Sequence, residues 1–115
     1  MRVVTFVLLL LVAACTRVPS ISDAQAQAVE GAAASLLGEA CCPDVPQGKW
    51  SPELRALNPK AVRVDNEGVY VVTGGWFVEE AGFFVPRHPE TFVPVDGDPE
   101  YKRIHGAVFS YRVRG

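Results

Sequence analysis

Residues 61–73 read AVRVDNEGVYVVT, and the pattern of this stretch sets the fold class. Val62 and Val64 alternate with polar neighbours, which is the two-residue period of a β-strand with one apolar face. Residues 65–68 (DNEG) have the composition of a type I turn that closes on a glycine with positive φ, and residues 69–73 return as a second strand. The stretch therefore predicts an antiparallel β-hairpin.

Two further segments of the chain have strand character. Residues 76–80 and 83–85 predict a second hairpin, with its turn at Glu80-Ala81-Gly82. Residues 106–114 form the last predicted strand, in which apolar residues at every second position indicate one buried face. The short connections within the hairpins favour antiparallel pairing.

The intervening segment, residues 86–103, is rich in proline, which excludes a regular central strand. We expect an irregular connection with a brief edge strand at residues 91–95. Asp98-Pro99-Glu100 has the composition of a helix cap and first turn, so a one-turn helix is predicted from Asp98 to Arg103.

Two helices are predicted before the strands. Ser22 and Gln25 have the spacing of a capping box, and apolar residues at helical spacing follow them. A Ser-Pro pair at residues 51–52 is typical of a helix start, and a proline a few residues later keeps this second helix short. Residues 22–115 are therefore predicted to form one α+β domain, in which both helices pack on a small antiparallel sheet of four or five strands.

The beginning of the chain has a different pattern. Arg2 precedes an apolar run over residues 3–12, which is too short to span a bilayer, and Ala13-Ala14 precede Cys15. This arrangement resembles the signal peptide and lipobox of bacterial lipoproteins. The resemblance implies removal of residues 1–14, a lipid on Cys15 and a tether over residues 15–21; an ordinary secretory signal is the alternative.

The expected cellular location follows from the same resemblance. Thr16 stands after Cys15, whereas Asp at this position retains Gram-negative lipoproteins in the inner membrane. Its absence favours the outer membrane, facing the periplasm. The membrane, reached through the lipid on Cys15, is therefore the first expected partner.

Composition and charge exclude several other classes of partner. The formal net charge is −2 with the charges scattered along the chain, so there is no electrostatic footprint for nucleic acid. Two histidines without a third ligand do not make a zinc site, and the acidic residues 96–100 lack the complete ligand set of a calcium loop. We expect no metal and no cofactor.

Cys41 and Cys42 are adjacent, so a disulfide between them would close a strained ring. A vicinal disulfide, two free thiols and a bond to another chain all remain open. We favour a structural role in the loop over a redox or soft-metal dithiol, because no histidine or third cysteine lies nearby.

Two pairs of adjacent aromatic residues, Trp76-Phe77 and Phe83-Phe84, are the candidates for partner binding. Neighbours on a strand point to opposite faces, so one member of each pair must leave the face that packs on the helices. We expect the 86–100 loop to cover that member; the alternative is an exposed patch, with Arg87 and His88 beside it, that binds a partner.

The function expected from these features is a non-enzymatic binding or accessory module that uses its aromatic sheet face and the 86–100 loop on an envelope protein or glycan. A purely structural lipoprotein is the second interpretation. A small enzyme or redox protein using His88, or the Cys41 and Cys42 pair, comes last, because no nucleophile motif accompanies either. We therefore expect no catalytic residues.

Overall fold

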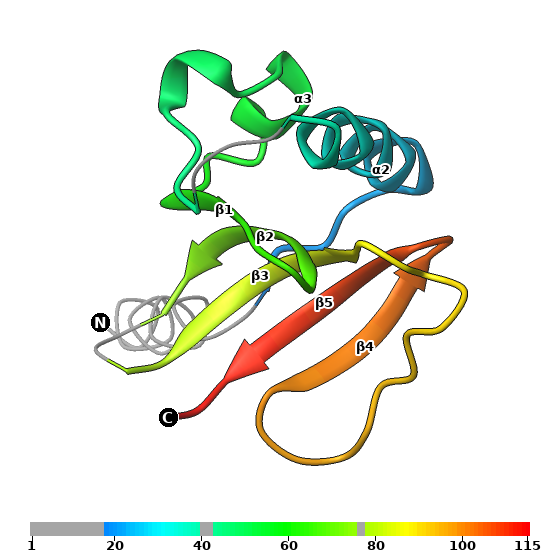
Figure 1. Cartoon of the computed structure of the whole chain (residues 1–115). Coiled ribbons are helices and arrows are strands. Elements are labelled where there is room, and N and C mark those ends of the chain that lie inside the picture. Colours follow the sequence, from blue (N-terminus) through cyan, green and yellow to red (C-terminus); the bar gives the residue numbers. More distant parts are fainter. Residues whose placement is uncertain (1–17, 40–42, 76–77) are drawn as a thin grey trace, which may run out of the picture.

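The computed structural model describes residues 18–39, 43–75 and 78–115, and these form an α+β fold (Figure 1). Both helices lie on one side of the sheet, which confirms the predicted class. The expectations for residues 1–17 and for Cys41, Cys42, Trp76 and Phe77 lie outside the described residues. The elements are α2 (Asp23–Leu37), a 3-10 turn (Gln47–Lys49), α3 (Pro52–Arg55), β1 (Ala61–Val64), β2 (Gly68–Gly74), β3 (Glu80–Pro86), β4 (Glu100–His105) and β5 (Val108–Val113).

The helix starts follow the capping chemistry of the sequence. The Gln25 backbone N–H donates to Ser22 Oγ at 3.1 Å, and the Ser22 backbone N–H donates to Gln25 Oε1 at 2.8 Å. This reciprocal pair satisfies two of the donors that every helix start leaves free. In the same way, Ser51 Oγ accepts from the Leu54 backbone N–H at 3.3 Å. Leu54 then anchors α3 as a fully buried side chain.

The sheet is antiparallel throughout, in the order β1-β2-β3-β5-β4. The predicted β1–β2 hairpin is present, and its turn is organised by Asp65, whose Oδ1 accepts from the Glu67 and Gly68 backbone N–H groups at 2.8 and 3.1 Å. The connection from β3 must pass over β5 to reach the edge strand β4 (Figure 1).

The predicted second hairpin was wrong in its turn. Glu80-Ala81-Gly82 belongs to β3, where Ala81 and Gly82 pair with β2 instead of forming a turn. Gly82 lies in the strand because the β2 and β3 backbones approach closely beside a bulge at Thr73, where a Cβ at Gly82 would overlap the Val71 carbonyl oxygen. The glycine that suggested a turn is therefore required by strand pairing.

The helix predicted from Asp98 to Arg103 was also wrong, as was the edge strand at residues 91–95. Pairing with β5 makes residues 100–105 a strand, and this long-range ladder overrides the local helix signal. Asp98 does not cap a helix. Its carboxylate instead accepts hydrogen bonds from the Arg114 and Gly115 backbone N–H groups, at 2.8 and 3.1 Å.

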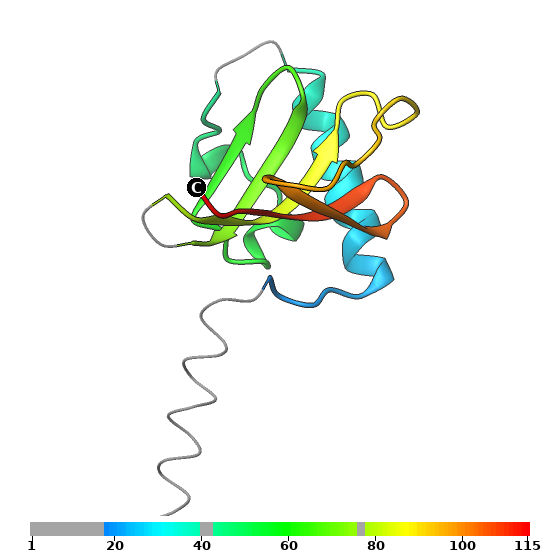
Figure 2. The ribbon, with the colours of Figure 1, turned by 90° about the horizontal axis from the view of Figure 1, so that it is seen from below.

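The sheet buries side chains on both faces. This corrects the one buried face expected from the last strand and agrees with the cover expected from the 86–100 loop. The helix side carries a core that includes Phe83, Val71 and Val108. On the opposite side the connection over residues 87–99 leads across the sheet to the edge strand β4 (Figure 2). We call the side chains beneath them the outer core; they are Tyr70, Phe84 and Tyr111, with Phe92, Tyr101 and Val113 partly buried around them.

Candidate functional site

The aromatic pair in β3 divides between the two cores. Phe83 and Phe84 are both 0% exposed. The ring centroids of Phe92 and Tyr101 lie 5.3 and 5.2 Å from that of Phe84, which confirms that the loop covers it. The partner-binding role considered for Phe83 and Phe84 was therefore wrong, because neither side chain reaches the surface.

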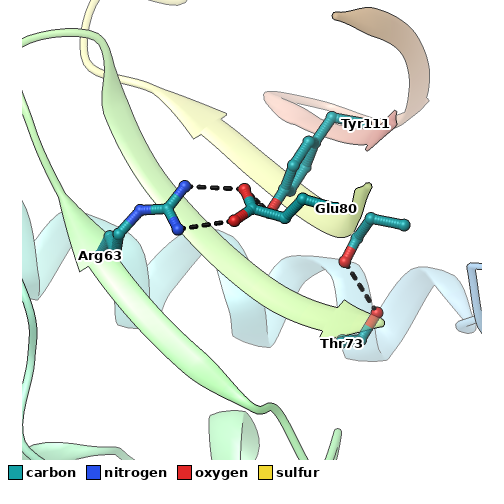
Figure 3. A network of polar contacts seen from close by, with 5 residues as sticks. Arg63, Thr73, Glu80 and Tyr111 are labelled. Atoms are coloured by element: carbon teal, nitrogen blue, oxygen red, sulfur yellow. Dashed lines mark hydrogen bonds and ion pairs between the residues drawn. The ribbon is translucent and has the colours of Figure 1, made fainter. Parts of the chain in front are cut away.

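A polar network lies beside the outer core (Figure 3). The Arg63 guanidinium donates to both carboxylate oxygens of Glu80 at 2.7 Å, and the Tyr111 hydroxyl donates to Glu80 Oε2 at 2.9 Å. Arg63 lies in β1 and Glu80 in β3, so the ion pair spans the intervening strand β2. The Thr73 hydroxyl donates to the carbonyl of Ala81, the residue after Glu80 in β3, at 3.5 Å.

This network joins the strands of the sheet and is not suited to proton transfer. The hydrogen bonds from Arg63 hold the pKa of Glu80 below its usual value, against the opposing effect of burial, and Tyr111 adds to the lowering. A general acid or base needs a pKa near the working pH and a free proton position. Glu80 has neither, since its carboxylate stays ionised and both oxygens are occupied.

A second polar group lies at the end of the sheet, around a cavity of about 470 Å³ between the β1–β2 turn and the 87–99 connection. Its size is within the range of ligand pockets, and its aromatic floor and polar rim match their composition. We call it the tyrosine pocket. We use floor for its aromatic and proline residues, which are Tyr70, Tyr101, Phe92, Pro86 and Pro99, and rim for its polar residues, which are Asn66, Glu67, His88 and Thr91.

Hydrogen bonds join the floor of the tyrosine pocket to its rim. The Tyr70 hydroxyl donates to Glu67 Oε2 at 2.7 Å and lies 3.0 Å from the Tyr101 hydroxyl. Burial raises the pKa of Tyr70, and its bond to the Glu67 carboxylate raises it further. Burial also raises the pKa of Tyr101, with the charges of Glu67 and Asp65 in support. Both phenols therefore keep their protons at neutral pH.

All three tyrosines of the chain are expected to resist ionisation in the folded protein, since burial raises the pKa of Tyr111 as well. An ordinary tyrosine ionises near pH ~10, so the unfolded chain loses these protons first, and the free energy of unfolding should fall as the pH rises above that value. Spectroscopic titration of tyrosinate should show ionisation only together with unfolding. The same titration in urea provides the control, and a native tyrosine that titrates normally would contradict the expectation.

The polar residues predicted beside the site have separate positions. His88 is on the rim of the tyrosine pocket, and its Nδ1 lies 3.7 Å from Glu90 Oε1, with both side chains exposed. Arg87 does not line the pocket. Its guanidinium donates to the Asp65 carbonyl at 2.9 Å, in the β1–β2 turn beside the pocket. The other histidine, His105, does not line the pocket, and its Nδ1 lies 3.5 Å from Asp23 Oδ1 at the start of α2.

Sequence reasoning missed the residues that build the tyrosine pocket. Glu67 was read only as a turn residue, Tyr70 as a strand residue, and Tyr101 was placed in a helix. One signal was present: Tyr70 interrupts the valines of its strand, as Tyr111 interrupts the last strand. Adjacent residues on a strand face opposite ways, so these tyrosines indicated a second aromatic face.

Other kinds of site have less support in the described part of the chain. Residues 18–39, 43–75 and 78–115 contain no group of three or more potential metal ligands. Within those same ranges, no helix is long and apolar enough to cross a membrane. Comparisons with protein-family models, with curated proteins and with solved structures find no match to this chain. Among the described residues, the tyrosine pocket is the candidate functional site.

Proposed function

We propose that this protein is a lipid-anchored protein of the cell envelope, on the outer membrane facing the periplasm, that acts as a non-enzymatic binding or accessory module. The tyrosine pocket is its binding site. The anchor is the lipid that the signal resemblance implies on Cys15. The observation that carries the binding role is a cavity with an aromatic floor and a rim of hydrogen-bonding side chains.

The position of the pocket supports this proposal. Figure 2 shows the β1–β2 turn and the start of the 87–99 connection at the end of the domain away from the blue segment that leads into α2. Cys15 precedes residue 18 by three positions, so a fully extended tether between them reaches only about 10 Å. A lipid on Cys15 would therefore hold the residue-18 end near the bilayer and turn the pocket toward the aqueous compartment.

The two alternative functions have less support. An enzyme needs an oriented base beside a nucleophile or substrate site, whereas the His88 and Glu90 pair is exposed and Glu80 is occupied by Arg63 and Tyr111. A purely structural lipoprotein has no need for a concave aromatic site. Cys41 and Cys42 carry no part of the proposal.

One experiment in cells tests anchor and site together. A photoreactive amino acid at Thr91, on the pocket rim, should form an adduct with a partner, and the same probe at exposed Glu53 on α3 should not. The Cys15→Ser chain should move from the membrane to the soluble fraction, while Cys42→Ser stays in the membrane. A membrane-bound Cys15→Ser chain would refute the anchor, and equal labelling from both probe positions would refute the binding site.

A further inference from the structure

The two carboxylates on the outer side of the sheet have different surroundings. Glu80 is held by Arg63 and Tyr111, which leaves it no capacity for a ligand. Glu67, on the rim of the tyrosine pocket, accepts one phenol proton and forms no ion pair with any residue in the described ranges. Its carboxylate therefore lines the pocket without an ion-pair partner among the described residues.

The hydrogen bonds in the pocket run in one direction. Tyr70 has a single hydroxyl proton, which it donates to Glu67. In the 3.0 Å contact between the two phenols, Tyr101 must then be the donor and Tyr70 the acceptor. With both phenol protons in use, the pocket offers a ligand the remaining lone pairs of Glu67 and of the Tyr101 oxygen. A ligand group that contacts Glu67 and the Tyr101 oxygen must therefore donate hydrogen bonds to them.

Two arginine side chains of the protein already contact aromatic rings on the outer side of the sheet. Arg63 places its Cζ 5.5 Å from the centroid of the Tyr70 ring while its nitrogens hold Glu80, and Arg103 places its Cζ 4.9 Å from the centroid of the Phe109 ring. A planar guanidinium stacks on aromatic rings and pairs with a carboxylate through two parallel hydrogen bonds. The tyrosine pocket combines the same two elements, aromatic rings and a carboxylate, without an arginine of its own in the lining.

We infer that the tyrosine pocket takes an arginine side chain of a partner protein, with the guanidinium paired to Glu67 and lying against the Phe92 and Tyr101 rings. This inference rests on the proposed function and specifies the partner of that site. A protein fits better than a free cation, because Val93 and Val95 on the same connection are 75% and 74% exposed. They offer apolar contact to the residues that flank the arginine, around a central anchor of the kind common in interfaces.

The test uses the full-length protein in a mild nonionic detergent and ligand-observed NMR. The probes are N-acetyl-arginine amide and N-acetyl-citrulline amide, which have nearly the same shape but differ in charge. We expect the arginine probe to bind about tenfold more tightly, as the combined effect of an ion pair and a cation–π contact. Glu67→Gln, which keeps an acceptor for Tyr70, should remove that preference, whereas Glu53→Gln on α3 should preserve it.

Three outcomes would overturn the inference: equal binding of the two probes, no detectable binding of arginine, or an unchanged preference in Glu67→Gln. A neutral probe such as methyl glucoside that binds while arginine does not would also refute it, but would leave the proposed binding role intact. Labelling from Thr91 in cells tests that role separately. If Glu67→Gln does not fold, Tyr101→Phe removes one acceptor oxygen and should weaken arginine binding severalfold with the preference over citrulline retained.

Discussion

Gly82→Ala is expected to lower the free energy of unfolding by at least about 3 kcal/mol, enough to unfold a domain of marginal stability. A Cβ at this position would overlap the Val71 carbonyl oxygen and crowd the Thr73 backbone nitrogen. Both obstacles are backbone atoms of the neighbouring strand, so no rotamer change relieves them. The two strands would have to separate where β2 and β3 pair.

Gly31→Ala is the matched control, for which we expect the free energy of unfolding to rise instead of fall. Gly31 lies in the middle of α2, is exposed, and a Cβ there would meet nothing within 4 Å. Alanine should therefore stabilise the helix by about 0.5–1 kcal/mol. Urea denaturation followed by circular dichroism measures both variants. If Gly82→Ala were as stable as the unmodified protein, the close approach of β2 and β3 would be wrong.

Phe84→Ala should lower the free energy of unfolding by about 3–5 kcal/mol, as much as Phe83→Ala does. The reason is that both side chains are 0% exposed although they lie on opposite faces of the sheet. Removing Phe84 would leave a cavity between Tyr70, Phe92 and Tyr101, whose rings contact it or surround it. The outer core thus contributes to stability on the same scale as the helix-side core.

The comparison distinguishes a second core from an exposed patch. Chemical denaturation of Phe84→Ala, Phe83→Ala and the surface variant Val93→Ala gives the measurement, and Val93→Ala should change stability by less than about 0.5 kcal/mol because its side chain is 75% exposed. A Phe84→Ala protein as stable as Val93→Ala would show that the loop does not cover this face in solution.

The outer core also explains how the site depends on the fold. Phe92 comes from the 87–99 connection, Tyr101 from β4 and Tyr70 from β2, and they meet over Phe84. Mutations that loosen this cluster should therefore disturb the tyrosine pocket as well. A binding site built on a packed aromatic cluster is held more rigidly than one built from a loop alone.

Several elements of the fold followed from local sequence, for identifiable reasons. The capping pair Ser22 and Gln25, the cap at Ser51 and the turn at residues 65–68 all depend on hydrogen bonds between residues a few positions apart. Such contacts require no knowledge of the rest of the chain. Alternation in β1 and β5 was equally local, because side-chain direction in a strand repeats every two residues.

The errors arose where distant segments compete with local preference. Residues 98–103 have a helix-start composition, but pairing with β5 makes residues 100–105 a strand. Gly82 suggested a turn, but the approach of β2 requires it within β3. In both places the favourable partner lies on another strand, and single-residue propensities contain no information about that partner.

By itself, the sequence determined the helix caps, the first hairpin, the α+β class and the resemblance of residues 1–15 to a lipoprotein signal, since each depends on neighbours along the chain. Only the tertiary structure decided that both sheet faces are buried and that Glu67, Tyr70 and Tyr101 meet at one pocket. Tyr70 and Tyr101 are 31 positions apart in sequence, and their hydroxyls come within 3.0 Å because the connection after β3 passes over β5 and returns along the sheet edge.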